Sequence, residues 1–302
     1  MKKTLALLFC FGLMSYSAFA ADIKGRLLDK VHDQQANDAR GNQQGEDDGD
    51  QGTVFPFASP GGSGRLIDHG GPVLTNAKVV YIFWGWASNT SDPYVSELIA
   101  FRASGMINHI GMLKQYRSTG STGFVGTQPD VYSATPPSST RVTDTMVMQK
   151  VNSSCAGLPG GCRTDTVYEV FIPAGYYSDD GTGATSCGGP NLQYCAYHSY
   201  GDGLSLPTNI KYSIEPYPSC SGCHGKANWT AFNDQEHFVV HETREAMSDE
   251  QLNAWYDRVG FEADDKCAWG GATLAFLFDE NVGGHTYAYQ MEYNNAGRNC
   301  VK

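Results

Sequence analysis

The residues best suited to chemistry lie between positions 233 and 248. His241 and Glu245 are four residues apart, so on a helix they share one face and can bind the same ion. Glu242 lies beside them and could take a proton from water at that ion. This is the H-E-x-x-H pattern of metallopeptidases with the second His replaced by Glu. Because carboxylates bind zinc and also harder cations, the pattern predicts Zn²⁺ and leaves Ca²⁺ as an alternative.

A catalytic zinc ion needs a third protein ligand and an open position for water. The acidic stretch Glu262-Ala-Asp-Asp265 follows the predicted helix, and we expect Glu262 to be the third ligand. Asp265 would then accept the second ring proton of His241 and orient its imidazole. These two roles can be exchanged, and His237, one helical turn before His241, is a rival ligand.

A helix from Asp234 to Met247 is predicted to carry this motif. Asn233 and Glu236, three residues apart, form a capping-box pattern that predicts where the helix begins. Earlier in the chain, Asp92 can cap a second long helix that starts at Pro93 and ends near Tyr116.

The remaining regular elements are predicted to be strands. The β-branched and aromatic run Lys78–Trp84 is typical of a buried strand. Further strands are expected at Arg141–Val151, Thr166–Pro173, Asn209–Ile214 and His285–Tyr293. Strands and helices that do not alternate strictly indicate an α+β fold with a mixed sheet.

The N-terminus predicts export from the cytoplasm. A Lys-Lys start, an apolar run from Leu5 and the Ala18-Phe-Ala20 site form a signal peptide over residues 1–20. Residues 21–64 are acidic and polar, which indicates a flexible arm or propeptide, so that one globular domain spans residues 65–302. Loss of Lys2 and Lys3 would change the net charge from −11 to −13. The absence of basic clusters argues against nucleic acid and anionic membrane as partners.

Eight cysteines remain after the predicted signal, and in an exported chain an even number indicates disulfides. Short loops favour the pairs Cys155 with Cys162 and Cys187 with Cys195. Cys267 with Cys300 would attach the C-terminus to the core. Cys220-Ser-Gly-Cys223 followed by His224 has the spacing of a zinc, redox or haem motif, but two ordinary disulfide cysteines are the simpler interpretation.

Seven short blocks, in this order along the chain, resemble the phosphate-induced, exordium-like family of secreted proteins. They are Asp68–Leu74, Val79–Gly85, Cys195–His198, Pro218–Cys223, His241–Asp249, Asn253–Tyr256 and Glu262–Cys267. Many plant members lack H-E-x-x-E, whereas bacterial relatives more often carry it, followed by a proline that is missing here after Asp249. The resemblance implies export and a cell-wall association, and it implies no particular reaction.

Two functional hypotheses follow. The first is a secreted zinc-dependent hydrolase, most simply a metallopeptidase with a zincin-like layout, acting on extracellular peptide, protein or cell-wall substrates. The second is a noncatalytic extracellular module that binds cell-wall carbohydrate or a protein partner through exposed aromatic side chains. Its candidate platform is Trp229, Trp255, Tyr256 and Trp269.

Overall fold

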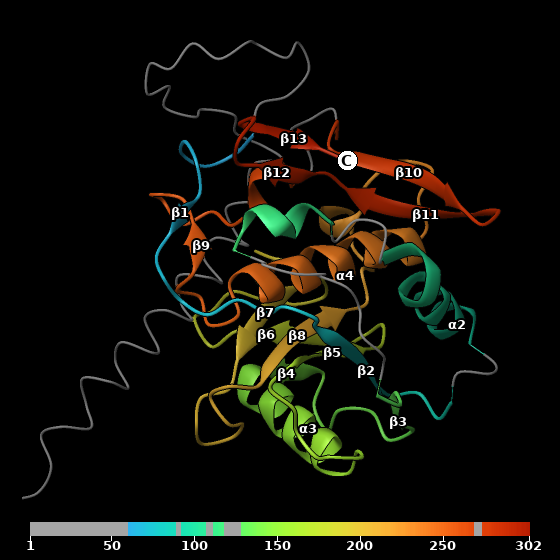
Figure 1. Cartoon of the computed structure of the whole chain (residues 1–302). Helices are drawn as coiled ribbons and strands as arrows, with labels where there is room; N and C mark the ends of the chain where they lie inside the picture. Colours follow the sequence, from blue (N-terminus) through green and yellow to red (C-terminus); the bar gives the residue numbers. More distant parts are fainter. Residues whose placement is uncertain (1–59, 89–91, 107–110, 118–127, 269–273) are drawn as a thin grey trace, which may run out of the picture.

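The computed structural model describes residues 60–88, 92–106, 111–117, 128–268 and 274–302 (Figure 1). The predicted signal peptide and nearly all of the predicted arm lie outside these ranges. Within them, no helix is long and apolar enough to cross a membrane.

A five-stranded mixed sheet forms the centre of the fold. Its strand order is β3-β2-β5-β8-β7, with β7 antiparallel to β8 and the other neighbours parallel. The strands are β2 (Lys78–Trp84), β3 (Val131–Ser133), β5 (Thr166–Ile172), β7 (Tyr197–Tyr200) and β8 (Lys211–Pro216). The predicted mixed sheet is therefore confirmed, and the strand Lys78–Trp84 has the predicted bounds.

Helices cover both faces of the sheet (Figure 1). On one face α3 (Asp144–Ala156) packs Val147 and Val151 against the sheet. On the other, α2 (Pro93–Ala100) and α4 (Ala231–Ser248) pack against aromatic side chains of β2 and β5.

The hairpin of β10 (Leu277–Val282) and β11 (His285–Gln290) packs on the side of α4 that faces away from the sheet (Figure 1). Short strand pairs complete the fold: β1 (Ile67–Asp68) with β9 (Trp255–Tyr256), β4 (Arg141–Thr143) with β6 (Tyr177–Asp179), and β12 (Glu292–Asn294) with β13 (Asn299–Val301). Because sheet and hairpin enclose α4, every residue from Asp234 to Ser248 is buried. Polar side chains in that stretch are therefore costly to bury unless each finds a hydrogen-bond partner or an ion.

The structure corrects the predicted strand at Arg141–Val151 and the predicted start of α4. The strand expected at Arg141–Val151 is only β4, three residues long, and then α3 begins. Thr143 caps that helix by accepting the N–H of Met146, and the valines that suggested a strand instead line one helical face. The helix α4 begins at Ala231, so Asn233 is not its N-cap. Thr230 takes that role, and the Asn233 side chain accepts the Thr230 N–H.

The second predicted helix starts as expected but is not continuous. Asp92 caps α2 by accepting the Tyr94 N–H at 3.0 Å. After Ala100 the backbone widens into a π-helix over Phe101–Gly105, and a 3₁₀-helix follows at Gly111–Gln115.

Four disulfides brace the described chain. The predicted pairs Cys155–Cys162 and Cys267–Cys300 are confirmed. The pair Cys187 with Cys195 is wrong, because these residues bond Cys220 and Cys223 respectively. Both cysteines of the C-x-x-C motif thus attach one tight turn to the segment that leads into β7, which confirms the disulfide interpretation of that motif.

Candidate metal centre

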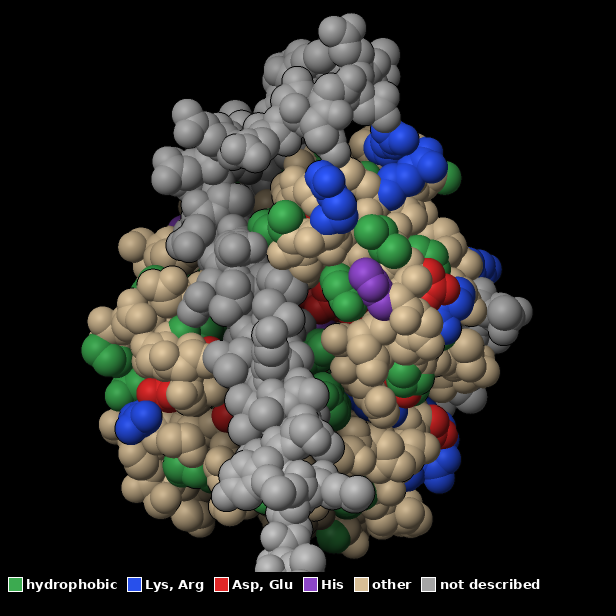
Figure 2. Space-filling model, turned by 90° about the vertical axis from the view of Figure 1, so that its left-hand side faces the viewer, with side chains coloured by type: hydrophobic (Ala, Val, Ile, Leu, Met, Phe, Trp, Pro, Cys, Tyr) green, Lys and Arg blue, Asp and Glu red, His purple; other side chains and the backbone are tan. Residues whose placement is uncertain are grey.

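Six acidic and histidine side chains come together where α4 meets the edge of the sheet. The helix supplies His241, Glu242 and Glu245, β7 supplies His198, and the segment after β9 supplies Glu262 and Asp265. All six are buried, and His241 is the most exposed at 7%. Figure 2 shows one face of the molecule, on which charged side chains of both signs and a histidine lie among other side-chain types.

One group of ligand atoms surrounds the ring of His241. Its Nε2 lies 3.1 Å from Glu245 Oε2 and 3.7 Å from Asp265 Oδ1. Tetrahedral zinc bonds of about 2.0–2.2 Å place ligand atoms roughly 3.3–3.6 Å apart, close to these values. Asp265 was expected to contact the other ring nitrogen of His241, but it faces the same nitrogen as Glu245. Asp265 Oδ1 therefore lies beside the two residues of the helical motif, where the third donor atom was expected.

A second group of atoms surrounds the ring of His198. Its Nδ1 lies 3.4 Å from Glu242 Oε2 and 3.8 Å from Glu245 Oε2. Its Nε2 lies 3.6 Å from Glu262 Oε2. Glu262, which was expected to be the third ligand beside His241, thus lies next to the other nitrogen of the His198 ring.

Strand alternation explains why His198 reaches α4. In β7, successive side chains point to opposite faces of the sheet. Tyr197 packs into the core under α3, so His198 points to the face that α4 covers. Register pairs His198 with Ser213 of β8, and Ser213 in turn with Glu169 of β5, which gives this face a buried polar row.

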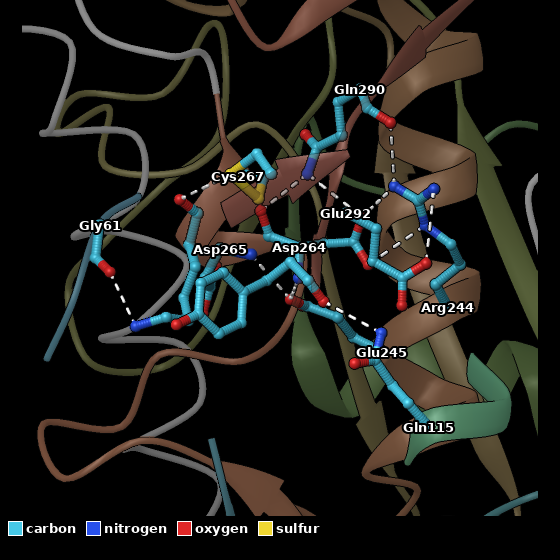
Figure 3. Close-up of a disulfide and its surroundings, with 12 residues drawn as sticks. Gly61, Gln115, Arg244, Glu245, Asp264, Asp265, Cys267, Gln290 and Glu292 are labelled. Atoms are coloured by element: carbon cyan, nitrogen blue, oxygen red, sulfur yellow. Dashed lines mark hydrogen bonds and ion pairs between the residues drawn. A yellow bond between two sulfur atoms is a disulfide. The ribbon is translucent and has the colours of Figure 1, made fainter. Parts of the chain in front are cut away.

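Glu245 is held so that one carboxylate oxygen faces both histidines. Its Oε1 accepts the backbone N–H groups of Asp264 and Asp265, each at 3.0 Å. Asp264 is itself fixed by the buried guanidinium of Arg244, which also donates to the carbonyl of Gln290 (Figure 3). These contacts leave Oε2 directed at His241 and His198.

Burial of the carboxyl groups in the centre shifts their pKa values, because it removes the charged forms from water. Burial raises the pKa of Glu242, although the positive potential of His241 and His198 opposes the shift. Burial would also raise the pKa of Glu245, but the attraction to His241 outweighs it and lowers this pKa. Behind the helix, burial raises the pKa of Glu169 to about 8.

One carboxylate oxygen of the helical motif, Glu242 Oε2, accepts no hydrogen bond from the described residues, although its side chain is only 3% exposed. A buried acceptor without a donor costs about 1–3 kcal/mol, and more when it is charged. A bound cation removes this cost, so the residues present fit a metal ion.

Two other candidate residues, His237 and Trp229, pack against neighbouring side chains away from the centre. His237, the rival ligand, packs against the rings of Trp229 and Phe238. Trp229 is itself buried and donates its Nε1 to Asp279, so it offers no exposed platform.

Of the remaining predicted aromatic platform, Trp255 and Tyr256 are half-buried and Trp269 lies outside the described residues. The signal that could have singled out His198 was the Cys195-Ala-Tyr-His198 block, one of the seven that carry the family resemblance.

Comparison with known proteins adds no further constraint on the site. No family model, no curated protein and no solved structure matches the chain. The case for the centre therefore depends on its geometry.

Proposed function

We propose that the chain is a metal-dependent hydrolase, and specifically a zinc metallopeptidase. The observation that carries the proposal is the convergence of His241 Nε2, Glu245 Oε2 and Asp265 Oδ1, all within 4.8 Å of one another, with the buried carboxylate of Glu242 adjacent. One imidazole and two carboxylates form a donor set suited to Zn²⁺. Ca²⁺ is the less favoured ion, because it prefers six to eight oxygen ligands.

The residues divide the work as follows. His241, Glu245 and Asp265 hold the ion, which when bound polarises a scissile carbonyl and makes water more acidic. Glu242 takes the proton from the attacking water and passes it to the leaving group. The N–H groups of Asp264 and Asp265 fix Glu245, so the site is rigid before substrate arrives.

The fold supports the same proposal by analogy. A mixed sheet whose antiparallel edge strand β7 lies against the metal-binding helix resembles the zincin layout, although fold alone does not establish function. Four disulfides fit an oxidising compartment, and we propose that the protein is secreted and exordium-like. Its substrates would then be extracellular peptides, proteins or cell-wall material.

Elemental analysis and peptide cleavage test the proposal on protein purified without a chelator or histidine tag. We expect zinc to be bound, zinc at the His241 position to be lost in His241→Ala, and peptide-library turnover to require zinc. Glu242→Gln should abolish turnover while the His241 ion remains bound.

His237→Gln is the matched control, because His237 is buried on the same helix outside the centre. This variant should keep both metal and turnover. Protein that binds no metal, or calcium that His241→Ala does not displace, would contradict the proposal and favour the noncatalytic binding module.

A further inference from the structure

The ligand atoms of the centre fall into two groups that share one oxygen. Glu245 Oε2 belongs to the group with His241 and Asp265 and also to the group with His198 and Glu242. Within each group the three ligand atoms lie within 4.8 Å of one another, and among the described residues no such group contains both imidazoles. Two neighbouring cation positions fit this pattern better than one.

The distances around His198 fit metal coordination better than direct hydrogen bonds. Its Nδ1 is 3.4 Å from Glu242 Oε2 and 3.8 Å from Glu245 Oε2, whereas hydrogen bonds between N–H and oxygen are about 2.7–3.2 Å long. Ligand atoms that share one tetrahedral ion are roughly 3.3–3.6 Å apart. Side chains spread by this amount, in a site closed to solvent, leave room for an ion between them.

Glu245 is arranged to bridge two ions. Its Oε1 already accepts two backbone N–H groups, so only Oε2 is available to a cation. That oxygen lies 3.1 Å from His241 Nε2 and 3.8 Å from His198 Nδ1. It can therefore contact an ion on either side.

The charge of the centre also favours two ions. Four carboxylates, from Glu242, Glu245, Glu262 and Asp265, surround two imidazoles, and each is at most 3% exposed. Two divalent ions match the formal charge of four ionised carboxylates, whereas one divalent ion matches the charge of only two. Buried charges that lack compensation are strongly destabilising.

We propose that the centre binds two divalent cations bridged by Glu245 Oε2, with His198 and Glu242 as further ligands of the second. Glu262 Oε2 lies 3.6 Å from the other ring nitrogen of His198, Nε2. Paired ions about 3.5–4 Å apart are typical of hydrolases that activate one water between two metals. This proposal rests on the metal centre proposed above. It gives Glu242 a second role, as a ligand of the second ion, in addition to accepting the proton from water.

Mn²⁺ is the probe that separates the possibilities, because nitrogen and carboxylate ligands accept it and it is paramagnetic. The purified chain is stripped of metal, reloaded with Mn²⁺ and examined by native mass spectrometry and electron paramagnetic resonance. We expect two ions per chain with an exchange-coupled spectrum. His198→Gln should reduce the count to one ion with an uncoupled spectrum.

Glu242→Gln supplies a second variant on a different element, in case replacement of the buried His198 prevents folding. It should likewise reduce the count from two to one, and His237→Gln should keep two. One ion in the unaltered chain, or two ions whose number His198→Gln and Glu242→Gln leave unchanged, would overturn the second site alone. No bound ion would overturn the proposed hydrolase as well.

Discussion

Glu236 carries a stability cost that should grow with pH. It is fully buried on α4, and its Oε2 accepts the Ala288 N–H at 2.8 Å. Burial, reinforced by the nearby Glu97 carboxylate, raises the pKa of Glu236 to about 9. In the unfolded chain the same carboxyl ionises near its ordinary value of 4.5.

The sign of the effect follows from these two values. Between about pH 4.5 and pH 9 the folded chain keeps a proton that the unfolded chain has lost, so the free energy of unfolding falls as pH rises. Each pH unit costs about 1.4 kcal/mol, and pH 7 lies about 2.5 units above the lower value, which gives a cost of about 3 kcal/mol.

Glu236→Gln should remove this cost, because an amide does not ionise and its oxygen still accepts the Ala288 N–H. We expect urea unfolding to show the variant more stable than the unaltered chain by about 2–3 kcal/mol at pH 7 and nearly equal to it at pH 4. For a domain of this size the gain corresponds to a rise of roughly 4–10 °C in the melting temperature.

Glu236→Ala is the control, because it also removes the ionisable group but leaves the Ala288 N–H without its acceptor. It should be about 1–3 kcal/mol less stable than Glu236→Gln at every pH. A stability difference between Glu236→Gln and the unaltered chain that does not change from pH 4 to pH 8 would refute the reasoning.

Three further perturbations test the framework around the centre. Asp264→Asn removes the charge that compensates the buried Arg244 guanidinium, so it should cost about 3–5 kcal/mol in urea unfolding, and a loss below about 1 kcal/mol would contradict this. Replacing Cys267 and Cys300 by Ser opens a loop with a sequence separation of 33 and should cost about 3–4 kcal/mol in urea unfolding, and a loss below about 1 kcal/mol would contradict this. Chelation with EDTA should lower the melting temperature, because an ion at one hundred times its dissociation constant adds about 2.7 kcal/mol of stability, and an unchanged temperature would argue against a bound ion.

The local sequence pattern predicted an element correctly where its own side chains were enough to determine its conformation. The run Lys78–Trp84 is a strand with the predicted bounds, because its β-branched and aromatic side chains suit a position buried on both faces. The pattern failed at Arg141–Val151, where valines spaced for one helical face also matched a strand, and the Thr143 cap decided in favour of a helix.

The disulfides, too, were predicted correctly where the cysteines are close in sequence and wrongly where the tertiary fold selects the partner. Loop length correctly favoured Cys155 with Cys162, since the two positions are seven apart in the sequence. It failed for Cys187 and Cys195, because the fold brings the turn at Cys220–Cys223 beside the segment before β7. Sequence separation cannot show which distant turn comes closest.

The sequence alone placed His241, Glu242 and Glu245 on one helix, because a helical repeat of 3.6 residues fixes which side chains share a face. It also located the acidic segment that supplies Asp265. Only the tertiary structure brought His198 into the centre, since that contact requires β7 to add antiparallel to β8 and to turn one face toward α4. Only the tertiary structure, too, exchanged the expected positions of Glu262 and Asp265, because the backbone N–H groups that bind Glu245 set the course of the segment carrying both.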